Sequence, residues 1–451
     1  SAAGTVGWGP AEPLRSDLPD RDTERLRERI KACLDGHGGE VSARARAAEL
    51  GQAYLGLSAV GRARFLGVLA REYGVDRQRL DKAVAALGAA RSDADRLAAE
   101  QGLRAALEPP RLRLLTNFNA VPSGVKFLVD MRADLLPLVK GDAAMGALDE
   151  DLKALLAGWF DVGFLDLARI TWNAPAALLE RLIAYEAVHR IRSWADLKDR
   201  LDSDRRCYAF FHPRMPDEPL IFVEVALVNG MAASVQALLD EQAPAMDPNA
   251  ADSAIFYSIS NCQKGLGGVS FGNFLIKRVV DALSRDLPHL KTFATLSPMP
   301  GFRAWLDPLL AAGGKDLVTA RESAGLAAAV GGEAAGAAAI AVLLERTDWS
   351  TDNAAVAALR QPLLRLGARY LVREKRDKHA RDRVSHFHLS NGARVGRVNW
   401  LADVSPSGLA QSAGLMVNYH YKLDEIEANH EAYAGAGTIA AASAVSRLLK
   451  A

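Results

Sequence analysis

Apolar side chains recur at helical spacing from about residue 22 to residue 162. Leu26 and Ile30, for example, fall on one face of a helix, and similar sets follow through the segment. Glycine clusters and the Pro109-Pro110 pair interrupt the pattern, as is usual where helices end. The pattern therefore predicts an all-helical N-terminal domain, which we place at residues 1–160. Its charged outer faces carry no chemical constellation, which favours a scaffold or an oligomerisation unit.

The remaining residues, 161–451, combine strand and helix patterns, which is typical of an α/β domain. The expected strands are 207–212, 220–228, 292–296, 385–390, 394–399 and 415–421, and the expected helices are 175–188, 195–201, 233–241, 302–312, 337–344, 354–373 and 438–450. The first two strands form a hairpin, and Asn391-Gly392 has the composition of a type I′ turn between 385–390 and 394–399. Residues 374–383 form a basic, exposed loop.

A strand, a glycine-rich turn, a helix and a second strand follow one another between residues 253 and 298. Side chains alternate between two faces from Ile255 to Ser260, and apolar residues recur at helical spacing from 274 to 283. The turn between them holds Gly265, Gly267, Gly268 and Gly272. Such a βαβ-like unit can hold phosphate, because unpaired N–H groups and the helix dipole favour an anion at a helix start. A tight structural connection is an equally good interpretation of the glycines alone.

The glycine turn is neither a Walker loop nor a GxGxxG fingerprint. Its sequence, Lys264-Gly265-Leu266-Gly267-Gly268-Val269, resembles the loop of GNAT-type acetyltransferases, where a splayed strand feeds a loop and helix that hold the pyrophosphate of coenzyme A. The usual pattern there is Gln/Arg-x-x-Gly-x-Gly/Ala, and this chain departs from it at Lys264 and Val269. The resemblance implies a coenzyme A site at this turn.

Composition narrows the possible classes of protein. The chain has 451 residues, 49% of them hydrophobic and 24% charged, with a formal net charge of +1. This length suits two or three domains, and the near-neutral charge argues against a nucleic-acid or anionic-membrane binder. The three cysteines, Cys33, Cys207 and Cys262, lack metal-binding spacing, so reduced thiols and a cytoplasmic location are expected. Neither a signal peptide nor a membrane span is expected from the hydropathy of the chain.

Two residues stand out as candidates for chemistry. In a strand at 385–390, His386 and His388 lie on the same face. Two such histidines can bind a metal, but the expected strand 385–390 holds no carboxylate or cysteine to support this, and a lone strand histidine is more often structural. Ser297 ends a strand outside any Gly-x-Ser-x-Gly elbow, so the residues alone favour a turn former over a member of a hydrolase triad.

Four long segments resemble malonyl-CoA decarboxylases. They are FFHPRMPDEPLIFVEVAL at 210–227, FYSISNCQKGLGGVSFGNFLIKRVV at 256–280, TLSPMPGFRAWL at 295–306 and FHLSNGARVGRVNWLADVSPSGLAQSAGLMVNYHY at 387–421. The resemblance covers the whole C-terminal half, and the helical N-terminal half is similar in kind. It implies a helical N-terminal domain used to form a dimer or tetramer, followed by a GNAT-like, mixed-sheet α/β catalytic domain at 161–451.

The same resemblance implies a catalytic pair, Ser297 in the Leu-Ser-Pro motif and His388 in the Phe-His-Leu motif. With this pair, the coenzyme A loop of the family binds malonyl-CoA, and it corresponds here to Gly267, Gly268, Val269, Ser270, Phe271, Gly272 and Asn273. The implied enzyme is a carboxy-lyase that forms acetyl-CoA and CO2 with no metal or other cofactor. The chain ends Leu-Lys-Ala and not in the peroxisomal Ser-Lys-Leu of eukaryotic members, so a cytoplasmic enzyme is expected.

The residue types of the pair suit this reaction. Loss of CO2 from malonyl-CoA leaves an enolate on the thioester, and a fixed donor such as a serine hydroxyl stabilises the charge on its oxygen. A histidine can give the carbon its proton near neutral pH. Two other functions remain open at this point. One is an acyl-CoA-dependent N-acetyltransferase that uses the same loop, and the other is a non-catalytic malonyl-CoA-binding regulator.

Overall fold

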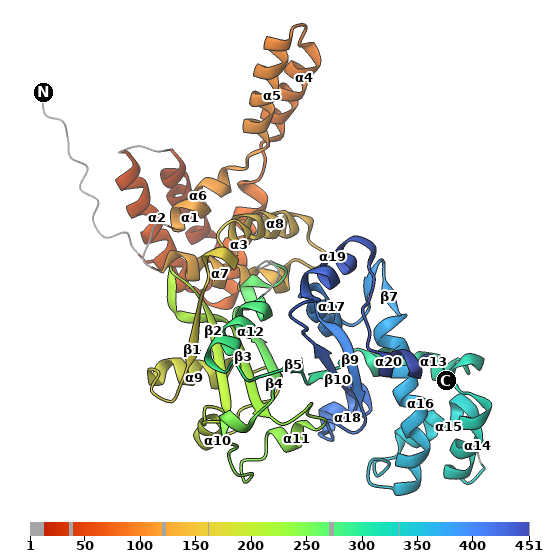
Figure 1. The fold of residues 1–451 in the computed structure, drawn as a ribbon. Helices are drawn as coiled ribbons and strands as arrows, with labels where there is room; N and C mark the ends of the chain where they lie inside the picture. The colour runs from red at the N-terminus through yellow and green to blue at the C-terminus, as the bar shows by residue number, and fades with distance from the viewer. Residues whose placement is uncertain are drawn as a thin grey trace, which may run out of the picture. The chain divides into compact units, whose positions relative to one another are not determined.

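The structure, a computed structural model, describes residues 13–35, 39–119, 123–160, 162–269, 275–332 and 334–450 (Figure 1). The chain divides into two compact units. Unit 1 comprises residues 1–165 with two short segments from later in the chain, 212–218 and 263–271. Unit 2 comprises 166–211, 219–262 and 272–451.

Unit 1 is helical, as the spacing of its apolar side chains predicted. Its helices are α1 (Asp20–Leu34), α2 (Gly39–Leu55), α3 (Ala59–Glu72), α4 (Arg77–Ala89), α5 (Asp93–Leu107), α6 (Pro110–Phe118), α7 (Gly124–Leu135), η1 (Leu136–Leu138), α8 (Ala143–Ala157), η2 (Val162–Phe164) and η4 (Lys264–Leu266). Leu26 and Ile30 are buried on one face of α1, as the pattern predicted. The side chain of Ser58 caps α3 by accepting a hydrogen bond from the N–H of Gly61.

Unit 2 is built on a mixed β-sheet, so the prediction of an α/β half is confirmed. The strand order is β1-β2-β3-β4-β5-β10-β6, with β9 paired to β10. The strands are β1 (Asp166–Ile170), β2 (Arg205–His212), β3 (Met215–Val228), β4 (Ser253–Asn261), β5 (Thr292–Thr295), β6 (Ser297–Pro298), β9 (Arg394–Asn399) and β10 (Met416–His420). β4 and β5 run parallel, whereas β10 is antiparallel to β5, β6 and β9. β2 and β3, the expected hairpin, are neighbours in the sheet.

Helices surround this sheet and include the one predicted after the glycine turn. They are α9 (Ala176–Tyr185), α10 (Trp194–Asp199), α11 (Val235–Leu238), η3 (Pro248–Ala250), α12 (Leu275–Asp286), α13 (Phe302–Ala311), η5 (Lys315–Leu317), α14 (Ala320–Ala329), α15 (Gly336–Glu345), α16 (Asn353–Val372), α17 (Arg383–Ser390), α18 (Pro406–Ser412), α19 (Ile426–Ala436) and α20 (Ser443–Leu448). The stripe Leu275, Val279 and Leu283 of α12 is buried. Because α12 connects the parallel strands β4 and β5, the βαβ-like unit is present.

The segment 385–390 belongs to helix α17, so our prediction of a strand there was wrong. Its apolar and polar residues alternate over only six positions, and so short a run fits either structure. The burial pattern is helical, because Ser385, His388 and Leu389 are buried at i, i+3 and i+4. Asp382 is the N-cap residue of this helix, and its side chain accepts hydrogen bonds from the N–H groups of the first turn.

The predicted hairpin turn at Asn391-Gly392 is the end of this helix instead. Asn391 caps the last turn of α17, and Gly392 has a φ of +81°, the left-handed conformation that ends many helices. Several short elements also escaped prediction, among them β1, α14, α18, α19 and a small hairpin, β7 (Lys375–Arg376) with β8 (His379–Ala380), in the segment 374–383. Within the described ranges, every helix is too short or too polar to cross a membrane.

Candidate active site

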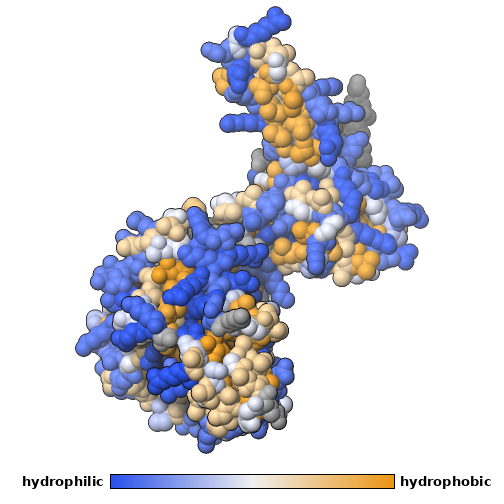
Figure 2. Space-filling model, turned by 90° about the vertical axis from the view of Figure 1, so that its right-hand side faces the viewer, coloured by the Kyte–Doolittle hydropathy of each residue, from blue (hydrophilic) through white to orange (hydrophobic). Residues whose placement is uncertain are grey.

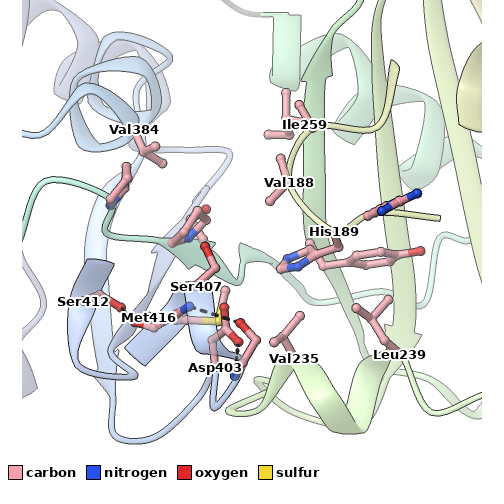
Figure 3. A pocket seen from close by; sticks show the side chains of 18 of the residues that line it. Val188, His189, Val235, Leu239, Ile259, Val384, Asp403, Ser407, Ser412 and Met416 are labelled. Carbon is pink, nitrogen blue, oxygen red and sulfur yellow. Dashed lines mark hydrogen bonds between the residues drawn. The ribbon is translucent and has the colours of Figure 1, made fainter. Parts of the chain in front are cut away.

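A large cavity opens in unit 2 where the parallel strands β4 and β5 part. The strands are paired as far as Phe256 and Thr295. The cavity has a volume of about 1760 Å³, and both Ser297 and His388 line it. Figure 3 shows its two walls, with Val188, His189, Val235, Leu239 and Ile259 on one side and Val384, Asp403, Ser407, Ser412 and Met416 on the other.

Ser297 lies on a short strand that the sheet holds in place. It pairs with Val417 of β10 and is 5% exposed. Its hydroxyl donates a hydrogen bond of 2.9 Å to Oγ1 of Thr295. The hydroxyl of Thr295 donates in turn to the carbonyl oxygen of Val417 at 3.5 Å and accepts the N–H of Tyr419 at 3.0 Å. The Ser297 hydroxyl is therefore fixed by a buried group that is itself fixed.

His388 reaches the same point from helix α17. Its Nε2 lies 3.0 Å from Oγ of Ser297, and its Nδ1 lies 2.8 Å from the hydroxyl oxygen of Tyr421. The ring of Tyr419 stacks on the imidazole, with 4.5 Å between the ring centroids. The structure therefore brings Ser297 and His388 together, although they are 91 residues apart in the sequence.

The hydrogen-bond pattern assigns the protonated nitrogen of this imidazole. Thr295 gives its hydroxyl hydrogen to a carbonyl, so it accepts the hydrogen of Ser297. The Ser297 oxygen then offers a lone pair to His388, so we assign the ring hydrogen to Nε2. Nδ1 is left as the acceptor for the hydroxyl of Tyr421. One chain of hydrogen bonds thus runs from Tyr421 through His388 and Ser297 to Thr295.

Burial keeps the two titratable side chains of this series of hydrogen bonds, His388 and Tyr421, neutral. His388 is 2% exposed, and burial lowers its pKa from the ordinary 6.5 to about 3. The same cause raises the pKa of Tyr421 well above its usual value of 10. At neutral pH the site therefore presents uncharged hydrogen-bond donors in a poorly hydrated environment. Neither Ser297 nor His388 carries a positive charge.

A buried ionic cluster supports the opposite wall of the cavity. Arg200, which lines the cavity, donates hydrogen bonds to Asp196 at 2.8 Å and to Glu224 at 3.1 Å. Burial and the neighbouring Glu186 raise the pKa of Glu224 to about 8. Glu186 accepts the hydroxyl of Ser258 at 2.8 Å. Because each of these side chains has a polar partner within the cluster, we assign the cluster a structural role.

The start of the glycine loop belongs to unit 1, where it packs on α7. A Cβ on Gly265 would meet the carbonyl oxygen of Val129 at 1.7 Å, so only glycine fits this contact. Arg132 donates hydrogen bonds to the carbonyl oxygens of Gly265 and Gly267 at 2.7 and 2.8 Å, and its Nε donates to Asp149. The structural interpretation of the glycines therefore holds for Gly265.

The residues predicted to bind coenzyme A are described in part. Gly268 is exposed and has a φ of +74°, a conformation that suits glycine. The Cε atom of Lys153 lies 3.8 Å from the place that a Cβ of Gly268 would occupy. Gly267 is exposed as well, whereas Val269 is buried. Ser270, Phe271, Gly272 and Asn273 lie outside the described residues.

Sequence reasoning missed the two hydroxyls that complete the hydrogen-bond chain. Thr295 lies two residues before Ser297, a spacing that places both side chains on one side of an extended chain, so a signal was available. Tyr421 gave no local signal, because its contact with His388 depends on the packing of β10 against α17.

The predicted common face of His386 and His388 is wrong, because these residues are helical. His386 is exposed, and its Nδ1 lies 2.8 Å from the hydroxyl oxygen of Tyr433. His388 is turned to the interior. Among the residues that the structure describes, no three or more His, Cys, Asp or Glu side chains are grouped so as to hold a metal ion.

Two family models match the chain. Residues 73–160 match the malonyl-CoA decarboxylase N-terminal domain, and residues 163–451 match the malonyl-CoA decarboxylase C-terminal domain. Among known relatives, the mitochondrial malonyl-CoA decarboxylase of Rattus norvegicus is 38% identical over 455 residues, which are 97% of this chain and 90% of the relative. That of Anser anser anser is 39% identical over 416 residues, which are 89% of this chain and 82% of the relative.

Solved structures of the same name share the fold. The malonyl-CoA decarboxylase from Rhodopseudomonas palustris superposes with a TM-score of 0.85 at 42% identity, covering 94% of this chain and 99% of that one. The one from Agrobacterium vitis gives a TM-score of 0.84 at 42% identity, with the same coverage.

Proposed function

Because the chain belongs to the malonyl-CoA decarboxylase family, we propose that Ser297 and His388 act together as its catalytic pair. The chain is an enzyme, a carboxy-lyase that converts malonyl-CoA to acetyl-CoA and CO2. The observation that carries the assignment of the pair is the 3.0 Å contact between Ser297 Oγ and His388 Nε2 on the wall of the cavity.

In the first step, the bond between the α-carbon and the carboxylate of the malonyl group breaks. CO2 leaves, and the electron pair of that bond forms the enolate of the thioester. The new charge collects on the thioester oxygen, where a donor fixed in advance lowers the barrier most. We assign this role to the hydroxyl of Ser297, because His388 holds its oxygen in place and only its hydrogen has to pass from Thr295 to the thioester oxygen.

In the second step, the α-carbon takes up a proton and becomes the methyl group of acetyl-CoA. We assign the Nε2–H of His388 as the donor, because it is the ring hydrogen that faces Ser297. As Nε2 releases this proton, the solvent that enters the cavity returns one to it, so the imidazole stays neutral. Tyr421, whose pKa burial raises, keeps its own hydroxyl hydrogen, which it donates to Nδ1, throughout. The proton taken from solvent is the one proton that the overall reaction consumes.

We propose that the coenzyme A part of the substrate binds at the loop Gly267 to Asn273. Three features support this assignment: Gly267 and Gly268 are exposed, Lys153 lies beside Gly268, and α12 begins soon after the loop at Leu275. Unpaired N–H groups at the start of such a helix favour the phosphates of the substrate.

We propose that the reaction needs no added metal or organic cofactor, because the thioester carbonyl is itself the electron sink. After dialysis against a chelator, kcat should stay within about twofold of its starting value, since no step draws on a Lewis acid. A loss of activity that a divalent cation restores would contradict this proposal.

The decisive experiment is to mix the purified chain with malonyl-CoA and to follow acetyl-CoA by mass spectrometry. We expect acetyl-CoA and CO2 in equal amounts. Tight binding of malonyl-CoA with no acetyl-CoA formed would identify a regulator instead. Transfer of an acetyl group from acetyl-CoA to an amine, without release of CO2 from malonyl-CoA, would identify an acetyltransferase.

We propose that the enzyme is a homo-oligomer, a dimer or a tetramer, assembled through the hairpin of α4 and α5. Among the described residues of this hairpin, only Ala106 is buried. Val84, Leu97 and Leu107 are 50–59% exposed, and Figure 2 shows apolar side chains gathered along the hairpin. A second copy of the hairpin can cover this surface.

Light scattering at micromolar concentration tests the proposed assembly. The unmodified chain should be larger than a monomer, and Leu97→Glu should shift it towards the monomer by placing charge on the covered surface. Leu423→Glu, at a position that is 48% exposed in unit 2, is the matched control and should leave the mass unchanged. A monomeric unmodified chain would refute the assembly.

We propose a cytoplasmic location for the enzyme. Cys33, Cys207 and Cys262 are buried thiols and form no disulfide, which fits a reducing compartment. Fractionation of the producing cells should recover malonyl-CoA decarboxylation with cytoplasmic markers, and recovery with an organelle or a membrane would contradict the proposal.

A further inference from the structure

Asp382 is a buried carboxylate surrounded by four hydrogen-bond donors. It is 2% exposed. Its Oδ1 accepts the N–H groups of Val384 and Ser385 at 2.9 and 3.0 Å, in the first turn of α17. Its Oδ2 accepts the hydroxyl of Tyr370 at 3.1 Å and the N–H of Gly301 at 3.4 Å. Each oxygen thus binds a different part of the chain.

The two oxygens of Asp382 hold the two segments that carry the catalytic pair. The helix capped by Oδ1 carries His388 further along. The residue bound by Oδ2, Gly301, follows Ser297 through the short segment 298–300 and caps α13. The contact between Ser297 and His388 joins the same two segments. A shift of one segment relative to the other therefore changes both contacts together.

Close packing makes this connection stiff. A Cβ on Gly301 would meet the hydroxyl oxygen of Tyr370 at 2.3 Å, so glycine is needed for the approach. Pro298 and Pro300 restrict the segment between Ser297 and Gly301. Met299, between the two prolines, is fully buried. The segment can therefore pass a displacement at Gly301 on to Ser297.

We propose that Asp382 is a positioning residue of the decarboxylase, which sets the separation of Ser297 and His388 without touching the substrate. Asp382 does not line the cavity, whereas its neighbours Arg383 and Val384 do. The proposal rests on the proposed function of the pair. A misplacement of about 1 Å in a reacting group can cost on the order of 10²-fold in rate, which sets the expected scale.

The test variant is Asp382→Asn, which keeps the shape of the side chain. Whichever way the amide is turned, its NH2 group takes the place of one of the two acceptor oxygens of Asp382. That NH2 group then faces N–H or hydroxyl donors, with which it cannot form a hydrogen bond. We expect kcat to fall about 10- to 100-fold and KM to change by less than about threefold. Tyr370→Phe removes one of the four donors and should lower kcat by about threefold.

The matched control is Asp142→Asn, because Asp142 caps a helix of unit 1 in the same way, and its Oδ2 pairs with Arg71. Its Oδ1 accepts the N–H groups of Ala144 and Met145 at 3.0 and 3.1 Å at the start of α8. This variant loses cap strength and should lower the melting temperature, but kcat should stay within about twofold. An equal loss of kcat in both variants would show a general effect of stability and overturn the proposal.

A crystal structure of Asp382→Asn tests the positioning role apart from turnover. The distance from Ser297 Oγ to His388 Nε2 should exceed about 3.5 Å, beyond hydrogen-bond reach, in an otherwise intact fold. An unchanged distance, or an unchanged kcat in a folded variant, would overturn the proposal. If Asp382→Asn does not fold, Tyr370→Phe decides in its place by the same two measurements. An unmodified chain that makes no acetyl-CoA would instead overturn the proposed function.

Discussion

The Ser297–His388 pair and the glycine loop are built in opposite ways. The pair consists of buried side chains from distant segments, and its partners Thr295 and Tyr421 come from further strands or strand ends. Among the described residues of the loop, the consecutive glycines Gly267 and Gly268 are exposed to solvent, and Val269 is buried.

The difference follows from what each region is proposed to do. Charge that develops during a reaction is stabilised best by donors that are already fixed and poorly hydrated, and such donors need the whole fold around them. Phosphates can be bound by a few neighbouring N–H groups at a surface. Changes in the pair should therefore lower the rate, and changes in the loop should weaken binding.

The largest expected effect concerns the pair. Ser297→Ala and His388→Asn should each lower kcat by about 10²–10³-fold or more, or about 3–4 kcal/mol, with little change in KM. The double variant should be little worse than the poorer single variant, because residues that act as a unit are not additive. Steady-state kinetics with melting curves for each variant measure this. Losses that multiply in the double variant would show that the two residues work independently.

The next effect concerns the burial of His388 and is seen in stability. The folded state keeps the imidazole neutral down to a pKa of about 3, whereas the unfolded chain takes up a proton near pH 6.5. Its contribution to stability is therefore complete above pH 6.5 and is lost as the pH falls. Between pH 7 and pH 5 the unmodified chain should lose about 2 kcal/mol more than His388→Asn. Urea unfolding of both proteins at pH 7 and pH 5 measures the free energy of unfolding. Equal losses in the two proteins would show that the imidazole of His388 has the same pKa in the folded and the unfolded chain.

The smallest expected effect concerns the loop. Gly268→Asp places a negative charge where we expect phosphate, so KM for malonyl-CoA should rise by at least about tenfold, or about 1.4 kcal/mol, with kcat nearly unchanged. Gly268→Ala introduces the same left-handed strain without charge and is the matched control. If both variants raise KM equally, backbone strain and not phosphate repulsion is responsible. An unchanged KM in Gly268→Asp would remove this residue from the site.

Local patterns predicted most of the helices and the central strands, because burial of one face dictates their spacing. They failed at 385–390, where six alternating residues fit a strand as well as a helix. The deciding signals were at the ends of the segment, since Asp382 is a helix N-cap and Gly392 suits a helix end.

Only part of the site could be predicted from the sequence. Spacing alone favoured a structural serine and a structural histidine, and the resemblance of long segments to a known family singled out Ser297 and His388. The hydrogen bond between Tyr421 and His388 and the one between Gly301 and Asp382 join segments far apart in the chain. Such contacts follow from the packed fold and leave little trace in local composition.

The start of the glycine loop packs on helix α7 of unit 1, and this contact matters when the two halves of family members are recombined. The family models divide the chain between residues 160 and 163, yet residues 263–271 belong with the helices. Arg132, encoded in the first half, holds the carbonyl oxygens of Gly265 and Gly267, encoded in the second. A recombination event at the boundary therefore separates the loop from its support. We expect chimaeras of two family members to differ from their parents in affinity for malonyl-CoA while they keep the turnover of the parent that supplies the second half.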